Sequence, residues 1–182
     1  LCTDNLSAPE IALPGENFGT STWSALADGS AQSISQISFQ PDWVWIKQRN
    51  GTYDHMLFDS VRGATKYLES NDTAIEATDA QTLTSFNSDG FSLGTASTVN
   101  GPNDSNSYVG WAWHAPTSVS GSTVSSGTAK TYSGKANADA GFSITKYEGN
   151  GTNYHWVPHS LGVTPELAIV RKYGDSAAEQ WP

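Results

Sequence analysis

Short runs of alternating apolar and polar residues, separated by turn-forming residues, recur along the chain. The two strongest are Trp43-Val-Trp-Ile-Lys-Gln and Tyr108-Val-Gly-Trp-Ala-Trp-His. Both are rich in aromatic and β-branched residues, which favour strands. We therefore expect Trp43–Gln48 and Tyr108–His114 to be central strands, with the first ending at the tight-turn pair Asn50-Gly51.

Weaker strand patterns fill most of the remaining chain. Asn87-Ser-Asp-Gly separates two of them and predicts a hairpin. The close spacing of strands and turns predicts an all-β fold, an antiparallel β-sandwich or jelly-roll-like unit with at most one short helix. The weaker predicted strands are Phe18–Ser24, Ser33–Phe39, His55–Asp59, Thr82–Phe86 and Phe91–Leu93.

An internal repeat defines the expected domain organisation. Phe18 aligns with Phe142 and Pro41-Asp42 with Pro165-Glu166 in one register without a gap. In both copies the Pro-acid pair precedes an apolar run that ends in a basic residue. We expect an irregular lead-in at 1–17, a first β-sandwich repeat unit at 18–115, a Ser/Thr/Gly-rich linker at 116–127, and the start of a truncated second unit at 128–182.

The repeat makes a geometric prediction. The segments Phe18–Lys47 and Phe142–Arg171 should superpose, because a slip of one residue would turn every side chain to the other face. The second unit lacks counterparts of the later strands of the first. We expect it to bury its apolar face on the first unit, on a neighbouring chain or on further sequence, since both ends of this sequence look cut from a larger protein.

The composition of the chain disfavours several classes of function. Nine Lys and Arg against eighteen Asp and Glu give a net charge of −9, which disfavours binding to nucleic acid or to anionic lipid. No apolar run reaches the roughly 20 residues of a spanning helix. The lone Cys2 cannot form an internal disulfide. We therefore expect neither nucleic-acid binding nor membrane insertion.

The densest group of polar residues follows the first strong strand. His55 with Asp59 could act as an acid–base pair. No nucleophile or oxyanion pattern accompanies them, so we favour a structural cluster in which Arg62 and carboxylates tie a turn to the sheet. We predict no catalytic residue, no cofactor and no metal site. The cluster is Asp54, His55, Asp59 and Arg62.

Four tryptophans allow a second interpretation. Within each strong strand the two tryptophans are two positions apart, so they share a face. If exposed, this face would stack on sugar rings; if buried, it would belong to the core. We favour burial for at least one tryptophan of each pair. The candidate glycan-stacking residues are Trp43, Trp45, Trp111 and Trp113.

Three longer strings stand out: Phe39-Gln-Pro-Asp-Trp-Val-Trp-Ile-Lys-Gln-Arg, Asp54-His-Met-Leu-Phe-Asp-Ser-Val-Arg-Gly-Ala and Leu83-Thr-Ser-Phe-Asn-Ser-Asp-Gly-Phe-Ser-Leu-Gly. They resemble a repeated domain of tail-fibre-like virion structural proteins from marine tailed phages. The lead-in Leu1-Cys-Thr-Asp-Asn-Leu resembles a segment that follows a SPRY-like, concanavalin-type domain. The resemblance implies a concanavalin-like β-sandwich and a place in the virion, but no assigned activity.

These observations together predict a structural or adhesive module of a phage virion appendage (a tail fibre, spike or capsid fibre) that contributes to host-surface attachment. Expected partners are other virion proteins, copies of the same chain in a homo-oligomer, and host-surface glycan. Two alternatives remain open. One is a lectin-like carbohydrate-binding module. The less favoured is a polysaccharide-degrading tailspike enzyme, which would need paired carboxylates in a groove.

Overall fold

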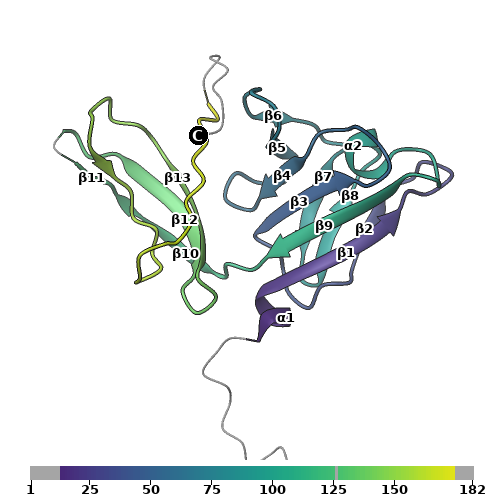
Figure 1. Cartoon of the computed structure of the whole chain (residues 1–182), viewed down its shortest axis with the longest axis horizontal. Coiled ribbons are helices and arrows are strands. Elements are labelled where there is room, and N and C mark those ends of the chain that lie inside the picture. Colours follow the sequence, from purple (N-terminus) through teal and green to yellow (C-terminus); the bar gives the residue numbers. More distant parts are fainter. Residues whose placement is uncertain (1–12, 126, 175–182) are drawn as a thin grey trace, which may run out of the picture.

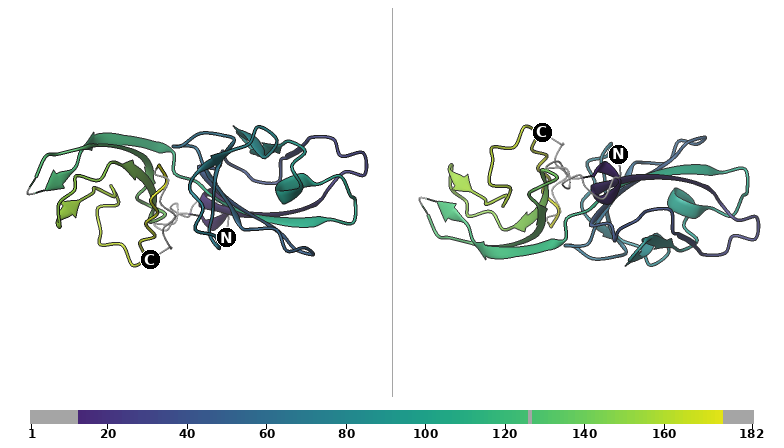
Figure 2. Two further views of the ribbon diagram at one scale, coloured as in Figure 1. Left: turned by 90° about the horizontal axis from the view of Figure 1, so that it is seen from above. Right: turned by 90° about the horizontal axis from the view of Figure 1, so that it is seen from below.

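The computed structural model describes residues 13–125 and 127–174, which form two β-rich units side by side along the long axis of the molecule (Figure 1, Figure 2). Residues 1–12, which hold Cys2 and most of the predicted lead-in, lie outside the described residues, as do residues 175–182 at the end of the predicted second unit. Of the described residues 40% are in strands and 5% in helices, which confirms the all-β prediction.

The first unit packs two antiparallel sheets face to face. The larger sheet has six strands in the order β1-β9-β3-β4-β5-β6, and the smaller has three in the order β2-β8-β7. The strands of the larger sheet are β1 (Phe18–Ser24), β9 (Ser107–Trp113), β3 (Trp43–Gln48), β4 (Met56–Asp59), β5 (Lys66–Glu69) and β6 (Ala77–Thr78). Those of the smaller are β2 (Gln32–Ile34), β8 (Gly90–Leu93) and β7 (Leu83–Asn87).

The two strongest sequence patterns form adjacent interior strands, as predicted. β9 pairs with β1 on one side and with β3 on the other. β9 is the last strand of the first unit along the chain, yet it lies between β1 and β3 and joins them into one sheet. The predicted strand at 33–39 is shorter than expected, since only Gln32–Ile34 pairs, with β8.

The core lies between the two sheets and centres on three aromatic rings. Trp23 stacks on Tyr108 at 5.7 Å between ring centroids and meets Phe91 edge-on at 5.8 Å. Gly110 makes room for this cluster, because a Cβ there would lie 3.1 Å from the Trp23 ring. Tyr108 Oη donates to the Ser97 carbonyl at 2.8 Å, so its buried hydroxyl is satisfied.

The predicted hairpin is confirmed as β7 and β8, joined by the turn at Asn87-Ser-Asp-Gly. Gly90 is required at its end for two reasons. Its φ is 151°, which other residues rarely adopt, and a Cβ would lie 1.8 Å from the Ile34 carbonyl oxygen. The turn therefore brings β8 close against β2.

The expectation of at most one short helix is wrong, because the described residues hold two. These are α1 (Pro14–Asn17) and α2 (Ser97–Asn100), each a single turn. Pro14 suits the start of α1, where its missing N–H has no helical partner. α2 depends on tertiary contact, since Trp23 Nε1 donates to the Val99 carbonyl at 3.1 Å. Its four residues carry no sequence pattern strong enough to predict it.

The described residues of the second unit form two small antiparallel sheets. One has the order β10-β12-β13 and the other pairs β11 with β14. Residues 116–127, predicted as a linker, instead contain β10 and β11. A Ser-rich segment can form a strand here because β12 supplies its backbone partners along six positions. The strands are β10 (Thr117–Ser122), β12 (Thr131–Asn137), β13 (Phe142–Tyr147), β11 (Val124–Ser125) and β14 (His155–Trp156).

The predicted superposition of the two repeat copies is wrong, because their strand topology differs: β1 pairs with the later strand β9, whereas β13 pairs with the earlier strand β12. The copies share only local features. Phe18 and Phe142 each begin a strand, and Ile37 and Leu161 are both buried. The later parts differ, because residues 167–171 form no strand and Pro165 is exposed whereas Pro41 is buried. The physical reason is the neighbour: β3 pairs with β4 and β9, and the described part of the second unit contains no counterpart of either.

Candidate functional site

The outer face of the six-stranded sheet carries the four candidate tryptophans. In β3 the side chains of Val44 and Ile46 point into the core, so Trp43 and Trp45 point outward. β9 alternates in the same way, with Ala112 buried between Trp111 and Trp113. All four tryptophans are half-buried on this outer face. The expectation that at least one of each pair belongs to the core is therefore wrong.

Pairing between β3 and β9 sets these tryptophans directly opposite one another. Trp43 is opposite Trp113 and Trp45 is opposite Trp111. Ring centroids are 4.7 Å apart in the first pair and 6.0 Å in the second, which meets edge-on. Cross-strand aromatic pairs of this kind stabilise a sheet by up to about 1 kcal/mol each. The face is a continuous aromatic row, extended at the edge by Phe18, 4.9 Å from Trp113.

One end of this row is covered by the second unit. Phe142, at the start of β13, stacks on Trp43 with centroids 5.7 Å apart and an interplanar angle of 8°. It also lies 6.0 Å from Trp113. We call Trp43, Trp113 and Phe142 the aromatic seam. Two of the four candidate tryptophans thus serve as a contact between units, and only Trp45 and Trp111 lie outside it.

Beside the seam, a buried carboxylate joins three parts of the chain. Asp42 is 1% exposed. Its Oδ1 accepts from Ser60 Oγ and from Lys135 Nζ, each at 2.7 Å, and its Oδ2 accepts from the Ala115 N–H at 2.8 Å. Charged partners make such hydrogen bonds stronger than neutral ones. Asp42 therefore ties the start of β3 to the end of β4, to the segment after β9, and to β12 of the second unit.

Further polar contacts continue along the same contact between units. Asn137 Nδ2 donates to Asn17 Oδ1 at 2.6 Å and to the His114 carbonyl at 3.2 Å. At the other end, Arg171 Nη2 donates to the Ala74 carbonyl at 2.7 Å. The Glu76 N–H donates to the Tyr173 carbonyl at 3.2 Å. The second unit is thus held by an ion pair, stacked rings and backbone hydrogen bonds.

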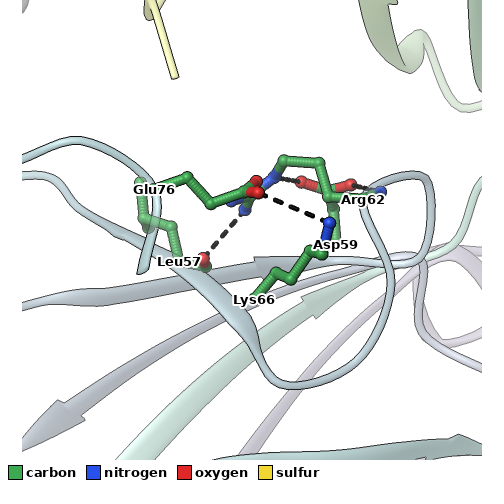
Figure 3. Close-up of polar contacts among 5 residues, drawn as sticks. All are labelled: Leu57, Asp59, Arg62, Lys66 and Glu76. Carbon is green, nitrogen blue, oxygen red and sulfur yellow. Dashed lines mark hydrogen bonds and ion pairs between the residues drawn. The ribbon is translucent and has the colours of Figure 1, made fainter. Parts of the chain in front are cut away.

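The structure divides the predicted polar cluster into two groups. In the first, the guanidinium of Arg62 pairs with Asp59, and its Nη1 donates to Glu76 Oε2 at 3.2 Å (Figure 3). Nη2 donates to the Leu57 carbonyl at 3.0 Å. All three charged side chains are at most 15% exposed. Each donor group of Arg62 shown in Figure 3 therefore has an acceptor, and this group braces the turn after β4.

His55 and Asp54 belong to the second group. Trp45 Nε1 donates to His55 Nδ1 at 2.9 Å, and Asn71 links the neighbouring residues by accepting from the His55 N–H at 2.8 Å and donating to Asp54 Oδ1 at 2.7 Å. Burial lowers the pKa of His55, and the nearby Lys47 lowers it further while Asp54 opposes the shift. A neutral imidazole is the form that can accept from Trp45. His55 and Asp59 thus have separate partners.

Sequence reasoning missed Asp42, Lys135 and Glu76 as organising residues. Asp42 had a signal, since the repeat alignment singled out the Pro-acid pair before the strand. No sequence pattern marks Lys135 or Glu76, because their partners Asp42 and Arg62 lie 93 and 14 positions away. Among the described residues, no group of three or more His, Cys, Asp or Glu side chains is placed to hold a metal ion. In the same residues, no helix is long and apolar enough to cross a membrane.

We expect the fold to become less stable as the pH falls, because His55 then takes up a proton. The lowered pKa means that the unfolded chain takes up this proton more readily than the folded one, so stability declines as the pH falls below about 6.5, the ordinary value for histidine. Thermal melts between pH 8 and pH 5 of the wild type and of His55→Gln, a neutral side chain that can also accept from Trp45, test this. The wild type should lose more stability than the variant over this range. Parallel curves would contradict the assignment.

In comparisons with curated proteins and with solved structures, no match to the chain was found. One family model does match, described as "Domain of unknown function (DUF7483)", and it covers residues 14–182. That match spans both units described above and nearly all of the chain. The chain therefore belongs to the DUF7483 family of domains of unknown function.

Proposed function

We propose that this chain is a structural and adhesive module of a phage virion appendage, a tail fibre, spike or capsid fibre, and that it contributes to host-surface attachment. Two arguments support the proposal. The first is the resemblance of its sequence strings to repeated domains of tail-fibre-like virion proteins. The second is the way in which its two units are joined, which suits a protein that must bear load along its length.

The observation that carries the proposal is the contact between the units. A linker that only tethered two domains would leave their surfaces free of specific contacts. Here Lys135 of the second unit reaches the buried carboxylate of Asp42 at 2.7 Å, and Phe142 stacks on Trp43. Paired charge and stacked rings fix both distance and orientation. Consecutive units are thereby held as one stiff element.

In this proposal the partners are other virion proteins and copies of the same chain, since closed symmetry is the usual arrangement of repeated subunits. The net charge of −9 fits a surface that avoids nucleic acid during assembly. The module works outside the cell as part of the particle after assembly in the host cytoplasm. It needs no cofactor and no catalytic group for this role.

Breaking the ion pair should weaken the contact between the units. Lys135→Met removes the charged donor and leaves Asp42 buried with only neutral partners, which should cost about 1.5–3 kcal/mol of the free energy of unfolding. Lys130→Met is the matched control, since Lys130 lies 3.9 Å from the exposed Glu148 and should change stability by under about 0.5 kcal/mol.

Calorimetry and hydrogen exchange measure the effect. In the Lys135→Met variant, amides of β12 and β13 should exchange faster while those of β7 and β8 stay protected. Equal behaviour of the two lysine variants would show that the ion pair does not join the units.

Location in the particle tests the biological part of the proposal. Antibodies raised against this chain should label an appendage on purified particles of the phage that encodes it, seen by immunogold electron microscopy, and should slow adsorption to host cells. Particles of an unrelated phage provide the control. Absence of the chain from purified particles by mass spectrometry would refute the virion assignment.

One observation favours a second candidate, a lectin-like carbohydrate-binding module. Trp45 and Trp111 remain outside the seam, half-buried, and the Trp45 ring is held in place by its hydrogen bond to His55. Thr20, opposite Trp111 on the edge strand, is exposed. Two aromatic rings with one exposed hydroxyl next to Trp111 suit contact with a sugar, so this face is the candidate for glycan contact.

If glycan contact occurs there, Trp111→Ala should weaken binding of the intact chain to host-surface polysaccharide by about tenfold or more, the scale of one lost stacking contact. Tyr154→Ala, which removes an aromatic ring that is 71% exposed on the second unit, is the control and should not change binding. Calorimetric titration measures both variants. Release of reducing ends during the titration would favour the tailspike-enzyme alternative, and absence of any binding would exclude the lectin-like one.

A further inference from the structure

Three asparagines in the chain are each followed directly by glycine, and the structure gives each of them different surroundings. They are Asn50-Gly51, Asn100-Gly101 and Asn150-Gly151. In such a pair the backbone nitrogen of the glycine can attack the side-chain amide carbon of the asparagine, because glycine has no Cβ to obstruct the approach. In a folded protein the reaction depends on how the amide and the attacking nitrogen are held.

The pair at Asn100 is closed to this reaction. Asn100 is 1% exposed, and its Nδ2 donates to the Ser30 and Gly94 carbonyls at 3.0 and 2.7 Å. The attacking nitrogen is also engaged, since the Gly101 N–H donates to Tyr108 Oη at 3.0 Å. The buried amide and the engaged nitrogen keep this pair unreactive.

The other two pairs begin the same triplet, Asn-Gly-Thr, so comparing them isolates the effect of the fold. The Asn50 side chain is held by a distant segment. Its Oδ1 accepts from the Ser107 N–H at 3.0 Å, and its Nδ2 donates to the Ser105 carbonyl at 2.6 Å. These bonds hold the amide toward the start of β9, so turning it over the Gly51 nitrogen works against both of them.

The Asn150 side chain is instead folded back over its own glycine. Its Oδ1 accepts from the Thr152 N–H at 3.1 Å, two residues further along the chain. The ring that this hydrogen bond closes contains both Asn150 Cγ and the Gly151 nitrogen, so the two reacting atoms are kept near each other. Gly151 is exposed, and no atom of the described residues other than its chain neighbours lies within 4 Å of where its Cβ would be. The approach is therefore open.

A second donor acts on the same oxygen. Thr152 Oγ1 lies 2.8 Å from Asn150 Oδ1 and 3.2 Å from the Tyr154 carbonyl oxygen. The hydroxyl has one hydrogen to donate, and the Asn150 oxygen is its nearer acceptor. Attack on the amide carbon places negative charge on Oδ1, and donors aimed at an oxygen that gains charge stabilise it. The N–H and the hydroxyl of Thr152 are thus placed to assist the reaction at Asn150.

We propose that Asn150 is a site of spontaneous deamidation, with water as the only co-reactant. The Gly151 nitrogen forms a bond to Asn150 Cγ, and the bond from Cγ to the side-chain nitrogen breaks. The proton that Gly151 gives up reaches the departing nitrogen through solvent, and that nitrogen leaves as ammonia. Water then opens the resulting succinimide at either carbonyl, which gives aspartate or isoaspartate without any change of oxidation state.

The product carries one more negative charge than the original chain, whose net charge is −9. The charge appears in the segment between β13 and β14. Isoaspartate also lengthens the backbone there by one methylene group. The inference does not rest on the proposed function, since the reaction needs only this chain and water.

Incubation of the intact chain at pH 8, followed by peptide mass spectrometry, measures the reaction at each pair. In water labelled with heavy oxygen, each event leaves a heavy oxygen atom in the product. Asn150 should react about tenfold or more faster than Asn50 in the folded chain. In urea that unfolds the chain the two Asn-Gly-Thr triplets should react at similar rates, because only the fold distinguishes them.

Matched variants at Thr152 test the role of its hydroxyl. Thr152→Val keeps the backbone N–H and removes the hydroxyl, so it should slow the reaction at Asn150 in the folded chain by about threefold or more, the scale of one hydrogen bond. Thr152→Ser keeps the hydroxyl and should react like the wild type. Thr152 is exposed, so both variants should fold. In urea all three chains should react alike.

Two results would overturn the inference. One is an equal or faster reaction at Asn50 than at Asn150 in the folded chain, and the other is an Asn150 that stays intact in the folded chain while it reacts in urea. Equal rates for Thr152→Val and Thr152→Ser in the folded chain would overturn the assistance assigned to the Thr152 hydroxyl.

Discussion

The buried carboxylate of Asp42 is the interaction on which the rest of the arrangement depends. It follows Pro41, immediately before β3, and its two oxygens take hydrogen bonds from Ser60, Ala115 and Lys135. These residues follow β4, follow β9 and lie within β12. A buried carboxylate is costly to desolvate unless each oxygen has a donor. The requirement for these donors therefore fixes where three chain segments lie around the start of β3.

That arrangement also explains the two-faced character of β3 and β9. One face of each strand packs into the sandwich core through Val44, Ile46 and Ala112, all fully buried. The other face carries tryptophans, and the Lys135 contact with Asp42 brings Phe142 onto Trp43. An outer sheet face rich in large aromatic rings would be poorly solvated alone. Here it becomes the surface on which the next unit is held.

The described part of the second unit shows what happens to the same pattern where counterparts of β4 and β9 are absent. β13, the counterpart of β1 in the repeat, forms because β12 supplies a partner, and Leu161 is buried like Ile37. Beyond Pro165 the apolar run remains exposed, although its sequence resembles that of a buried strand. Strand formation depends on a hydrogen-bonded neighbour as much as on the side chains of the strand itself.

The sequence alone determined the features that depend on local pattern. Alternation in Trp43–Gln48 and around Tyr108 to Trp113 placed two strands and the faces that their tryptophans share, and Asn87-Ser-Asp-Gly placed a hairpin. Only the tertiary structure decided which of those faces is core and that 117–122 pairs rather than links. It also brought Lys135 to Asp42, 93 positions apart. The physical reason is that periodicity fixes which side chains lie on one face, whereas burial, ion pairing and strand pairing depend on segments that meet only in the folded chain.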